Sequence, residues 1–157
     1  MLEVRGLDVN IDSTPILRGL AMNVPDGSMC GLIGRNGAGK TTFLRAIMGA
    51  LVAAAGEVMF NDQDLLKIDP HKRAHMGIGF MPEDRRLVPE LTAEENILVP
   101  VWATGMKDWE KRLTWIYDLM PEVAEFRNRG SFELSGGQQK FVAFARALMV
   151  GKHLLLL

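Results

Sequence analysis

The stretch GRNGAGKT, residues 34–41, fits the pattern G-x-x-x-x-G-K-[ST] and decides the fold. An apolar run, SMCGLI at 28–33, comes before it, and apolar residues with helical spacing follow it. We therefore expect a strand, a glycine-rich loop and a helix in that order. Glycines in the loop let the backbone turn its N–H groups inward at the positive end of the helix dipole. This arrangement predicts a loop that binds the phosphates of a nucleotide.

The residues of this loop have distinct expected roles. Lys40 supplies a positive charge for the β and γ phosphates, and the hydroxyl of Thr41 is an expected ligand of Mg²⁺. A glycine-rich turn that binds nothing is the alternative, but the flanking strand and helix favour the phosphate loop. The predicted nucleotide-binding residues are Gly34, Arg35, Asn36, Gly37, Ala38, Gly39, Lys40, Thr41 and Thr42.

Strand-like segments surround the loop. The segments MLEV, LDVNI and LAMNV, followed by the turn PDG at 25–27, predict a small antiparallel sheet. GEVMFN at 56–61 and GIGFM at 77–81 predict two further strands, and a helix beginning after Asp69 is expected between them. The helix after the loop is expected to end at Gly49. Its apolar face consists of Phe43, Leu44, Ile47 and Met48.

The pattern from residue 89 to about residue 129 is mostly helical and predicts a helical insertion. TAEE, residues 92–95, has the form of a capping box at a helix start. A further helix is expected after residue 135 with its end at Gly151, and LLLL at 154–157 predicts a strand buried on both faces. The stripe of that helix expected to be buried consists of Phe141, Val142, Ala145, Leu148 and Met149.

LSGGQQ, residues 134–139, is the second informative motif. Ser135 is placed to cap the following helix, and the glycines leave the backbone bare for close approach by another group. After a phosphate loop and before LLLL, this motif resembles the signature of the ATP-binding cassette (ABC) ATPases. In that family two nucleotide-binding domains face each other, and the signature of one closes over the γ-phosphate bound by the other. The resemblance implies ATP, a second ABC ATPase subunit as partner, and a site of Leu134, Ser135, Gly136, Gly137 and Gln138.

The stretch MPEDRRLVPELTAEENI, residues 81–97, resembles the ATPase subunits of branched-chain amino-acid importers. Most family members have a glutamine at the position of Glu83, where it contacts Mg²⁺ and senses the membrane partner. A carboxylate can take that place near the metal through water. The alternative is a solvated acid that pairs with Arg85 or Arg86. By resemblance, the expected metal residues are Thr41 and Glu83.

The family pattern continues beyond the four leucines with an aspartate that holds Mg²⁺ and a glutamate that polarises the attacking water. The catalytic residues are thus expected just after Leu157, and none is expected within these residues. The resemblance implies an α/β P-loop fold of the ABC type with its C-terminal third missing. It divides into an antiparallel β subdomain with the P-loop core at 1–88, a helical insertion at 89–133, and the signature helix with the start of a strand at 134–157. We expect a non-hydrolysing, aggregation-prone fragment.

Three other features of the sequence bear on binding. Family members usually stack adenine on an aromatic residue near the N-terminus, where this chain has Asn10 and Ile11, so only apolar contact from Ile11 and weak base discrimination are expected. The tryptophans at 102, 109 and 115 are expected in the core or facing a permease. The spacing of His71 and His75 would allow them to share a metal, but no third ligand is near in sequence, so we expect a solvated helix face.

Composition limits the class of protein. The chain has 18 basic and 19 acidic residues, which gives no overall attraction to nucleic acid. One cysteine excludes an internal disulfide framework and suits a reducing compartment, and no apolar run approaches the length of a membrane span. The expected function is the ATP-binding, energy-coupling subunit of a branched-chain amino-acid importer, at the inner face of the membrane through permease subunits. A urea or amide importer and a non-transport ABC ATPase are the alternatives.

Overall fold

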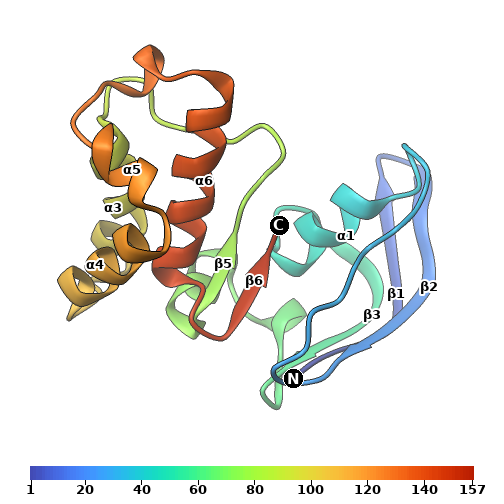
Figure 1. Cartoon of the computed structure of the whole chain (residues 1–157). Coiled ribbons are helices and arrows are strands. Elements are labelled where there is room, and N and C mark those ends of the chain that lie inside the picture. The colour runs from blue at the N-terminus through green and yellow to red at the C-terminus, as the bar shows by residue number, and fades with distance from the viewer. The chain divides into compact units, whose positions relative to one another are not determined.

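The computed structural model describes all residues, 1–157, and divides into two compact units (Figure 1). The first unit comprises Met1–Arg73 and the second comprises Ala74–Leu157. Both contain strands and helices, which agrees with the expected α/β class.

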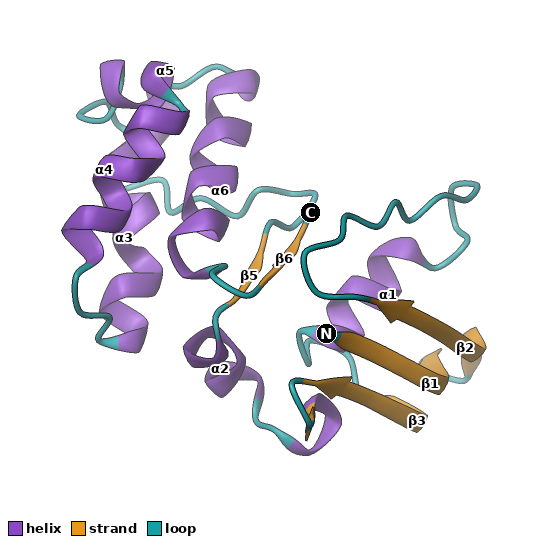
Figure 2. Ribbon diagram, turned by 60° about the horizontal axis from the view of Figure 1, so that its bottom comes forward, coloured by secondary structure: helices purple, strands orange, loops and turns teal.

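A four-stranded antiparallel sheet forms most of the first unit, in the order β2-β1-β3-β4. Its strands are β1 (Leu2–Ile11), β2 (Thr14–Val24), β3 (Ala53–Phe60) and β4 (Gln63–Asp64). Helix α1 (Lys40–Ile47) lies against one face of this sheet, and the short helix α2 (Pro70–Arg73) ends the unit (Figures 1 and 2). The predicted antiparallel sheet is confirmed, although its two N-terminal segments form one continuous strand.

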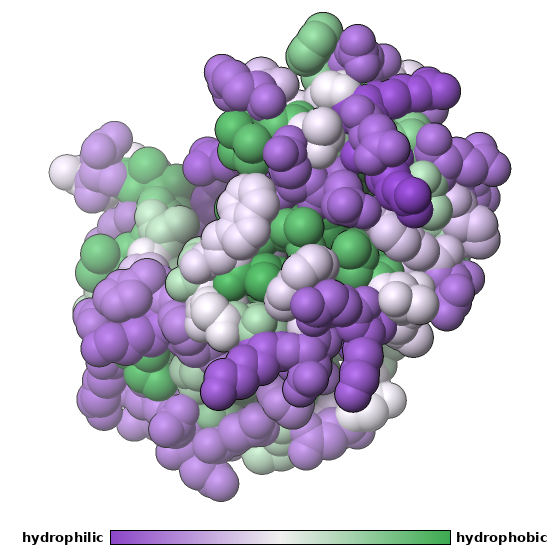
Figure 3. Space-filling view, turned by 90° about the vertical axis from the view of Figure 1, so that its left-hand side faces the viewer, coloured by the Kyte–Doolittle hydropathy of each residue, from purple (hydrophilic) through white to green (hydrophobic).

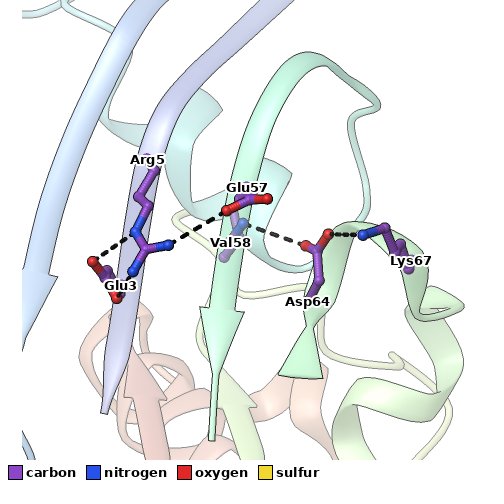
Figure 4. Close-up of polar contacts among 6 residues, drawn as sticks. All are labelled: Glu3, Arg5, Glu57, Val58, Asp64 and Lys67. Carbon is purple, nitrogen blue, oxygen red and sulfur yellow. Dashed lines mark hydrogen bonds and ion pairs between the residues drawn. The ribbon is translucent and has the colours of Figure 1, made fainter. Parts of the chain in front are cut away.

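A polar network crosses the β1–β3–β4 side of this sheet (Figure 4). Arg5 pairs with Glu3 at 2.7 Å and with Glu57 at 3.6 Å. The carboxylate of Asp64 accepts hydrogen bonds from the backbone N–H groups of Val58 and Leu66 and pairs with Lys67 at 3.1 Å. Burial raises the pKa of Asp64, but these bonds outweigh it and hold the pKa below its usual value.

The strand expected at 28–33 is wrong. This segment has no strand assignment, and its side chains are outside the core: Met29 is 99% exposed and Ile33 is 96% exposed. A strand requires a neighbouring strand to bond its N–H and C=O groups, and none of the paired strands in the first unit pairs with this segment. An apolar composition alone therefore did not make these residues a strand.

The second unit contains a short parallel pair, β5 (Ile78–Phe80) and β6 (Leu154–Leu156), with helix α6 (Gly136–Val150) packed against it (Figure 2). A Cβ at Gly79 would lie 2.1 Å from the carbonyl oxygen of Ala147, so the helix touches the strand backbone here. Three residues of the strand predicted at 154–157 form β6, but its predicted burial on both faces is wrong: only Leu156 is buried, Leu154 and Leu155 are half-buried, and Leu157 is 62% exposed.

The helical part of the second unit consists of α3 (Ala93–Thr104), α4 (Trp109–Leu119) and α5 (Pro121–Glu125). Thr92 and Glu95 form the predicted capping box at the start of α3. On α6 the predicted buried stripe is confirmed except at Phe141, which is 48% exposed. The core shared by these helices consists of Ala93, Ile97, Val101, Leu113, Ile116, Met120, Val123, Phe126, Leu134, Val142, Ala145, Leu148 and Met149.

Candidate nucleotide-binding site

The loop at residues 34–39 leads directly into α1 in the first unit. The ammonium group of Lys40 folds back over this loop: its Nζ donates hydrogen bonds to the carbonyl oxygens of Gly34 at 2.7 Å and Arg35 at 2.9 Å. The N–H of Ala38 also donates to the Arg35 carbonyl, at 3.1 Å. These bonds close the loop on itself and bring a positive charge against it.

Gly39 joins the loop to the helix. Its φ of +94° is in the left-handed region, and a Cβ there would lie 2.7 Å from Cδ2 of Leu17 on β2. Any side chain would therefore be strained and would also push the loop away from the sheet. Glycine at this position lets α1 begin against β2.

The start of α1 suits an anion. No side chain caps the helix, and its first turn contains no acidic residue. The N–H groups at a helix start have no partners within the helix, and they lie at the positive end of its dipole. Together with Lys40 they fit a phosphate group, and the half-buried Thr41 adds a hydroxyl in the same turn.

Arg73 holds the other end of α1. This arginine is 3% exposed, and its guanidinium donates to the carbonyl oxygens of Ala46 and Ile47 at the end of the helix. It also donates to the carbonyl oxygen of Ile68, from Nε at 3.2 Å and from Nη2 at 3.0 Å. Burial disfavours the charged guanidinium and lowers the pKa of Arg73 from its ordinary value. The carbonyl contacts favour the charge, because they place it at the negative end of the helix dipole.

Ile11 lies at the end of β1, where it pairs with Thr14 across the hairpin, and it is 41% exposed. Its apolar side chain is therefore accessible, as the proposed contact with adenine requires. It belongs to the same unit as the phosphate loop.

The signature residues form a turn at the start of α6 in the second unit. The Oγ of Ser135 accepts from the N–H of Gln138 at 3.2 Å, and Oε1 of Gln138 accepts from the N–H of Ser135 at 2.9 Å. This reciprocal cap confirms the predicted capping role of Ser135. Leu134 is buried, whereas Ser135, Gly136 and Gly137 are exposed. The turn thus presents a hydroxyl and bare backbone to the surroundings.

The loop that contains Glu83 lies in the same unit and contacts α6. Glu83 is exposed, and Arg86 pairs with Asp84 at 2.8 Å rather than with Glu83. The guanidinium of Arg146, on α6, donates to the backbone carbonyls of Arg85 and Arg86. Burial lowers the pKa of Arg146, but an arginine stays charged in proteins.

The roles of Arg73, Arg85 and Arg146 in these contacts were not predicted. Arg146 is flanked on α6 by the buried Ala145 and Ala147, and an arginine within an apolar helical stripe was the available signal. Arg73 and Arg85 had no comparable signal: Arg73 binds the carbonyls at the end of α1, and Arg85 donates to the carbonyl of Gly136, far along the chain.

The remaining candidates divide between surface and core. Figure 3 shows apolar side chains gathered on the face of the second unit that it views. In this unit Trp102 is 58% exposed and Trp115 is 42% exposed, whereas Trp109 packs against the helical core.

His71 and His75 are both exposed, and no group of three or more His, Cys, Asp or Glu side chains is arranged to hold a metal. No helix is long and apolar enough to cross a membrane.

Comparison with known proteins identifies a family. The family model described as "ABC transporter" matches residues 17–157. A probable branched-chain amino acid transport ATP-binding protein LivF of Archaeoglobus fulgidus is 29% identical over 157 residues, covering 100% of this chain and 66% of that protein. The high-affinity branched-chain amino acid transport ATP-binding protein BraG of Pseudomonas aeruginosa is 33% identical over 141 residues, covering 90% of this chain and 60% of that protein. The chain thus spans less than two thirds of the length of these relatives.

Other relatives are named for the transport of different substrates. The methionine import ATP-binding protein MetN of Rhodopseudomonas palustris is 38% identical over 141 residues, which are 87% of this chain and 38% of that protein. Among solved structures, the dimeric structure of MJ0796, described as a bacterial ABC transporter cassette, has a TM-score of 0.82 at 27% identity, covering 95% of this chain and 69% of that chain. A structure of MJ0796 in a post-hydrolysis state bound to ADP and Pi has a TM-score of 0.81. These likenesses confirm the expected fold.

Proposed function

The chain belongs to the ABC transporter family of ATP-binding domains, and on that premise we propose that it is part of the energy-coupling subunit of an ABC importer. The observation that carries this proposal is the loop at 34–39, which begins α1 and is closed by Lys40. A positive charge, a helix start and a turn without carboxylates together favour a triphosphate.

The residues of the chain have separate tasks in this proposal. The loop amides and Lys40 bind and orient the phosphates, and Ile11 gives the adenine an apolar contact. Thr41 and Glu83 are the residues that would hold Mg²⁺, Glu83 through water; the ion would neutralise phosphate charge. Thr41 has no carboxylate beside it in the first turn of α1, so its hydroxyl suits an ion whose other ligands are phosphate oxygens and water.

The signature turn is proposed to act on nucleotide bound by a second ABC ATPase subunit. Ser135 keeps its hydroxyl proton available as a donor, because its Oγ serves as the acceptor in the cap. The exposed glycines next to it allow close approach. The dimeric structure of the related MJ0796 cassette supports such a pairing, and its structure with ADP and Pi supports ATP hydrolysis as the activity of the whole protein.

Branched-chain amino acids are the proposed cargo of the transporter. LivF and BraG both bear that name, and the likeness at residues 81–97 points in the same direction. A related urea or amide importer is the second candidate. Relatives named for methionine and Fe(3+) import show that ATP-binding subunits of this family serve several cargoes, so a permease or binding protein sets the choice.

A transmembrane permease is the other proposed partner and would hold the subunit at the inner face of the membrane. The exposed Trp102 and Trp115 support this, because apolar side chains on a surface favour a protein contact. Leu119 is also exposed, at 53%, on the same helix as Trp115. These side chains offer a surface for such packing.

The test is MgATP binding by the Lys40→Ala variant. We expect affinity about 10- to 100-fold weaker, since charge-assisted bonds contribute about 1.5–3 kcal/mol each. A matched control is Lys111→Ala, an exposed lysine on α4, whose affinity should stay within about twofold of the original. Equal affinity for both variants by calorimetric titration would refute the phosphate role of the loop and, with it, the proposed function.

A further inference from the structure

The segment at 82–88, between β5 and α3, contacts the first turn of α6. Nη1 of Arg85 donates a hydrogen bond to the carbonyl oxygen of Gly136 at 3.2 Å. The same nitrogen would lie 3.4 Å from a Cβ built at Gly136, so the guanidinium lies directly against this residue. An arginine of the loop therefore touches the turn that carries the signature residues.

A second arginine fixes the backbone of that loop. Arg146, farther along α6, donates from Nη1 to the carbonyl of Arg86 at 2.7 Å and from Nη2 to the carbonyl of Arg85. Both loop residues have left-handed backbone, with φ of +59° at Arg85 and +48° at Arg86. A single guanidinium thus binds the carbonyls of two consecutive residues.

Left-handed backbone is unfavourable for residues with side chains and persists where surrounding contacts determine it. Here two contacts join the loop to α6. Arg146 on α6 binds backbone carbonyls of the loop, and Arg85 on the loop binds a backbone carbonyl of α6. The two contacts support one another. If the backbone of Arg85 returned to an ordinary conformation, its carbonyl and its side chain would both change direction.

We propose that Arg85 is a positioning residue for the signature turn and that Arg146 holds the loop in the conformation from which Arg85 reaches Gly136. This rests on the proposed function, in which Glu83 and the signature turn both take part in nucleotide binding. Glu83 is on the same loop, shortly before Arg85. Within the second unit, this loop therefore joins the position of Glu83 to the signature turn.

The experiment compares Arg85→Ala with its neighbour Arg86→Ala by hydrogen–deuterium exchange of the chain, read at residues 136–140. Both positions have a positive φ, but the side chain of Arg86 pairs with Asp84 and not with α6. We expect amides in this turn to exchange about three- to tenfold faster in Arg85→Ala, the factor for loss of one hydrogen bond. Arg86→Ala should stay within about twofold, and Arg85→Lys, which retains a donor, should restore part of the protection.

Two further measurements separate this role from general stability and from the proposed function. Arg146→Met should reproduce the faster exchange, and the affinity of Arg85→Ala for MgATP should stay within about twofold while its MgATP-dependent self-association weakens. Equal exchange in Arg85→Ala and Arg86→Ala would overturn the positioning role. Faster exchange only in Arg85→Ala, in a chain that retains no MgATP, would support the positioning role and refute the proposed function.

Discussion

Replacing Arg73 by methionine removes a buried cation from the end of the phosphate-loop helix while it keeps an unbranched side chain. In the native chain the guanidinium supplies donors to Ala46, Ile47 and Ile68. The carbonyl of Ala46 also accepts from the N–H of Gly49 at 3.0 Å, so it keeps one partner. The carbonyls of Ile47 and Ile68 depend on Arg73 alone for side-chain donors.

The magnitude follows from these carbonyls. An acceptor that is buried and loses its partner costs about 1–3 kcal/mol, which applies to the carbonyl of Ile47. The carbonyl of Ile68 is only partly buried, so water can replace its donors and it adds about 0–1 kcal/mol. Removing a charge from a buried position offsets part of this cost, because burial already disfavours the charged form and lowers the pKa of Arg73. We therefore expect Arg73→Met to lower the free energy of unfolding by about 1–3 kcal/mol.

The assay is urea denaturation followed by circular dichroism. With an m-value of about 2 kcal/mol/M, the expected loss moves the midpoint by about 0.5–1.5 M. Lys72→Met is the matched control, because Lys72 is the neighbouring cation and forms only an exposed pair with Asp69 at 2.8 Å. Its effect should be about 0–0.5 kcal/mol. A midpoint for Arg73→Met no lower than that of the control would show that the helix end does not depend on this guanidinium.

Gly79→Ala should lower the melting temperature by several degrees, since its Cβ would lie 2.1 Å from the carbonyl oxygen of Ala147 and overpacking costs about 1–3 kcal/mol. Gly31→Ala, whose nearest heavy atom would lie at 4.0 Å, should leave the melt unchanged, and equal melts for the two variants would contradict the contact. For Asp64, the folded pKa is below the unfolded value of about 3.9, so its ionised form stabilises the fold above that pH and the stabilisation is lost as pH falls through the folded pKa. The stability difference between the native chain and Asp64→Asn should be constant above about pH 5 and shrink below about pH 4. A difference independent of pH in acid denaturation would exclude this role of the hydrogen bond from Leu66 and the pairing with Lys67.

The features that could be predicted from the sequence are mostly local. The capping boxes of Thr92 and Ser135 each join residues three apart, so their side chains and backbone partners are neighbours in any helix start. The glycine spacing of the phosphate loop likewise sets its own backbone: Gly37 and Gly39 have φ of +81° and +94°. Such patterns are confined to a few consecutive residues and can be recognised without the rest of the fold.

The features that could not be predicted depend on distant partners. Arg73 binds a carbonyl 27 residues away and Arg85 binds one 51 residues away, and no sequence pattern identifies the backbone carbonyl that a distant arginine will bind. Residues 28–33 have the composition of a strand, but strand formation also depends on a neighbouring strand. Phe141 follows the helical period and is nevertheless 48% exposed, because the position of the packing helices decides where the buried stripe ends.

The exposed segment before the phosphate loop has a practical consequence. It contains Cys30, the single cysteine of the chain, and its thiol is accessible. A maleimide dye would therefore label one known position without mutagenesis, only a short stretch of backbone before Gly34. Changes in its emission during rapid mixing with a nucleotide would give a time course for rearrangement of the loop.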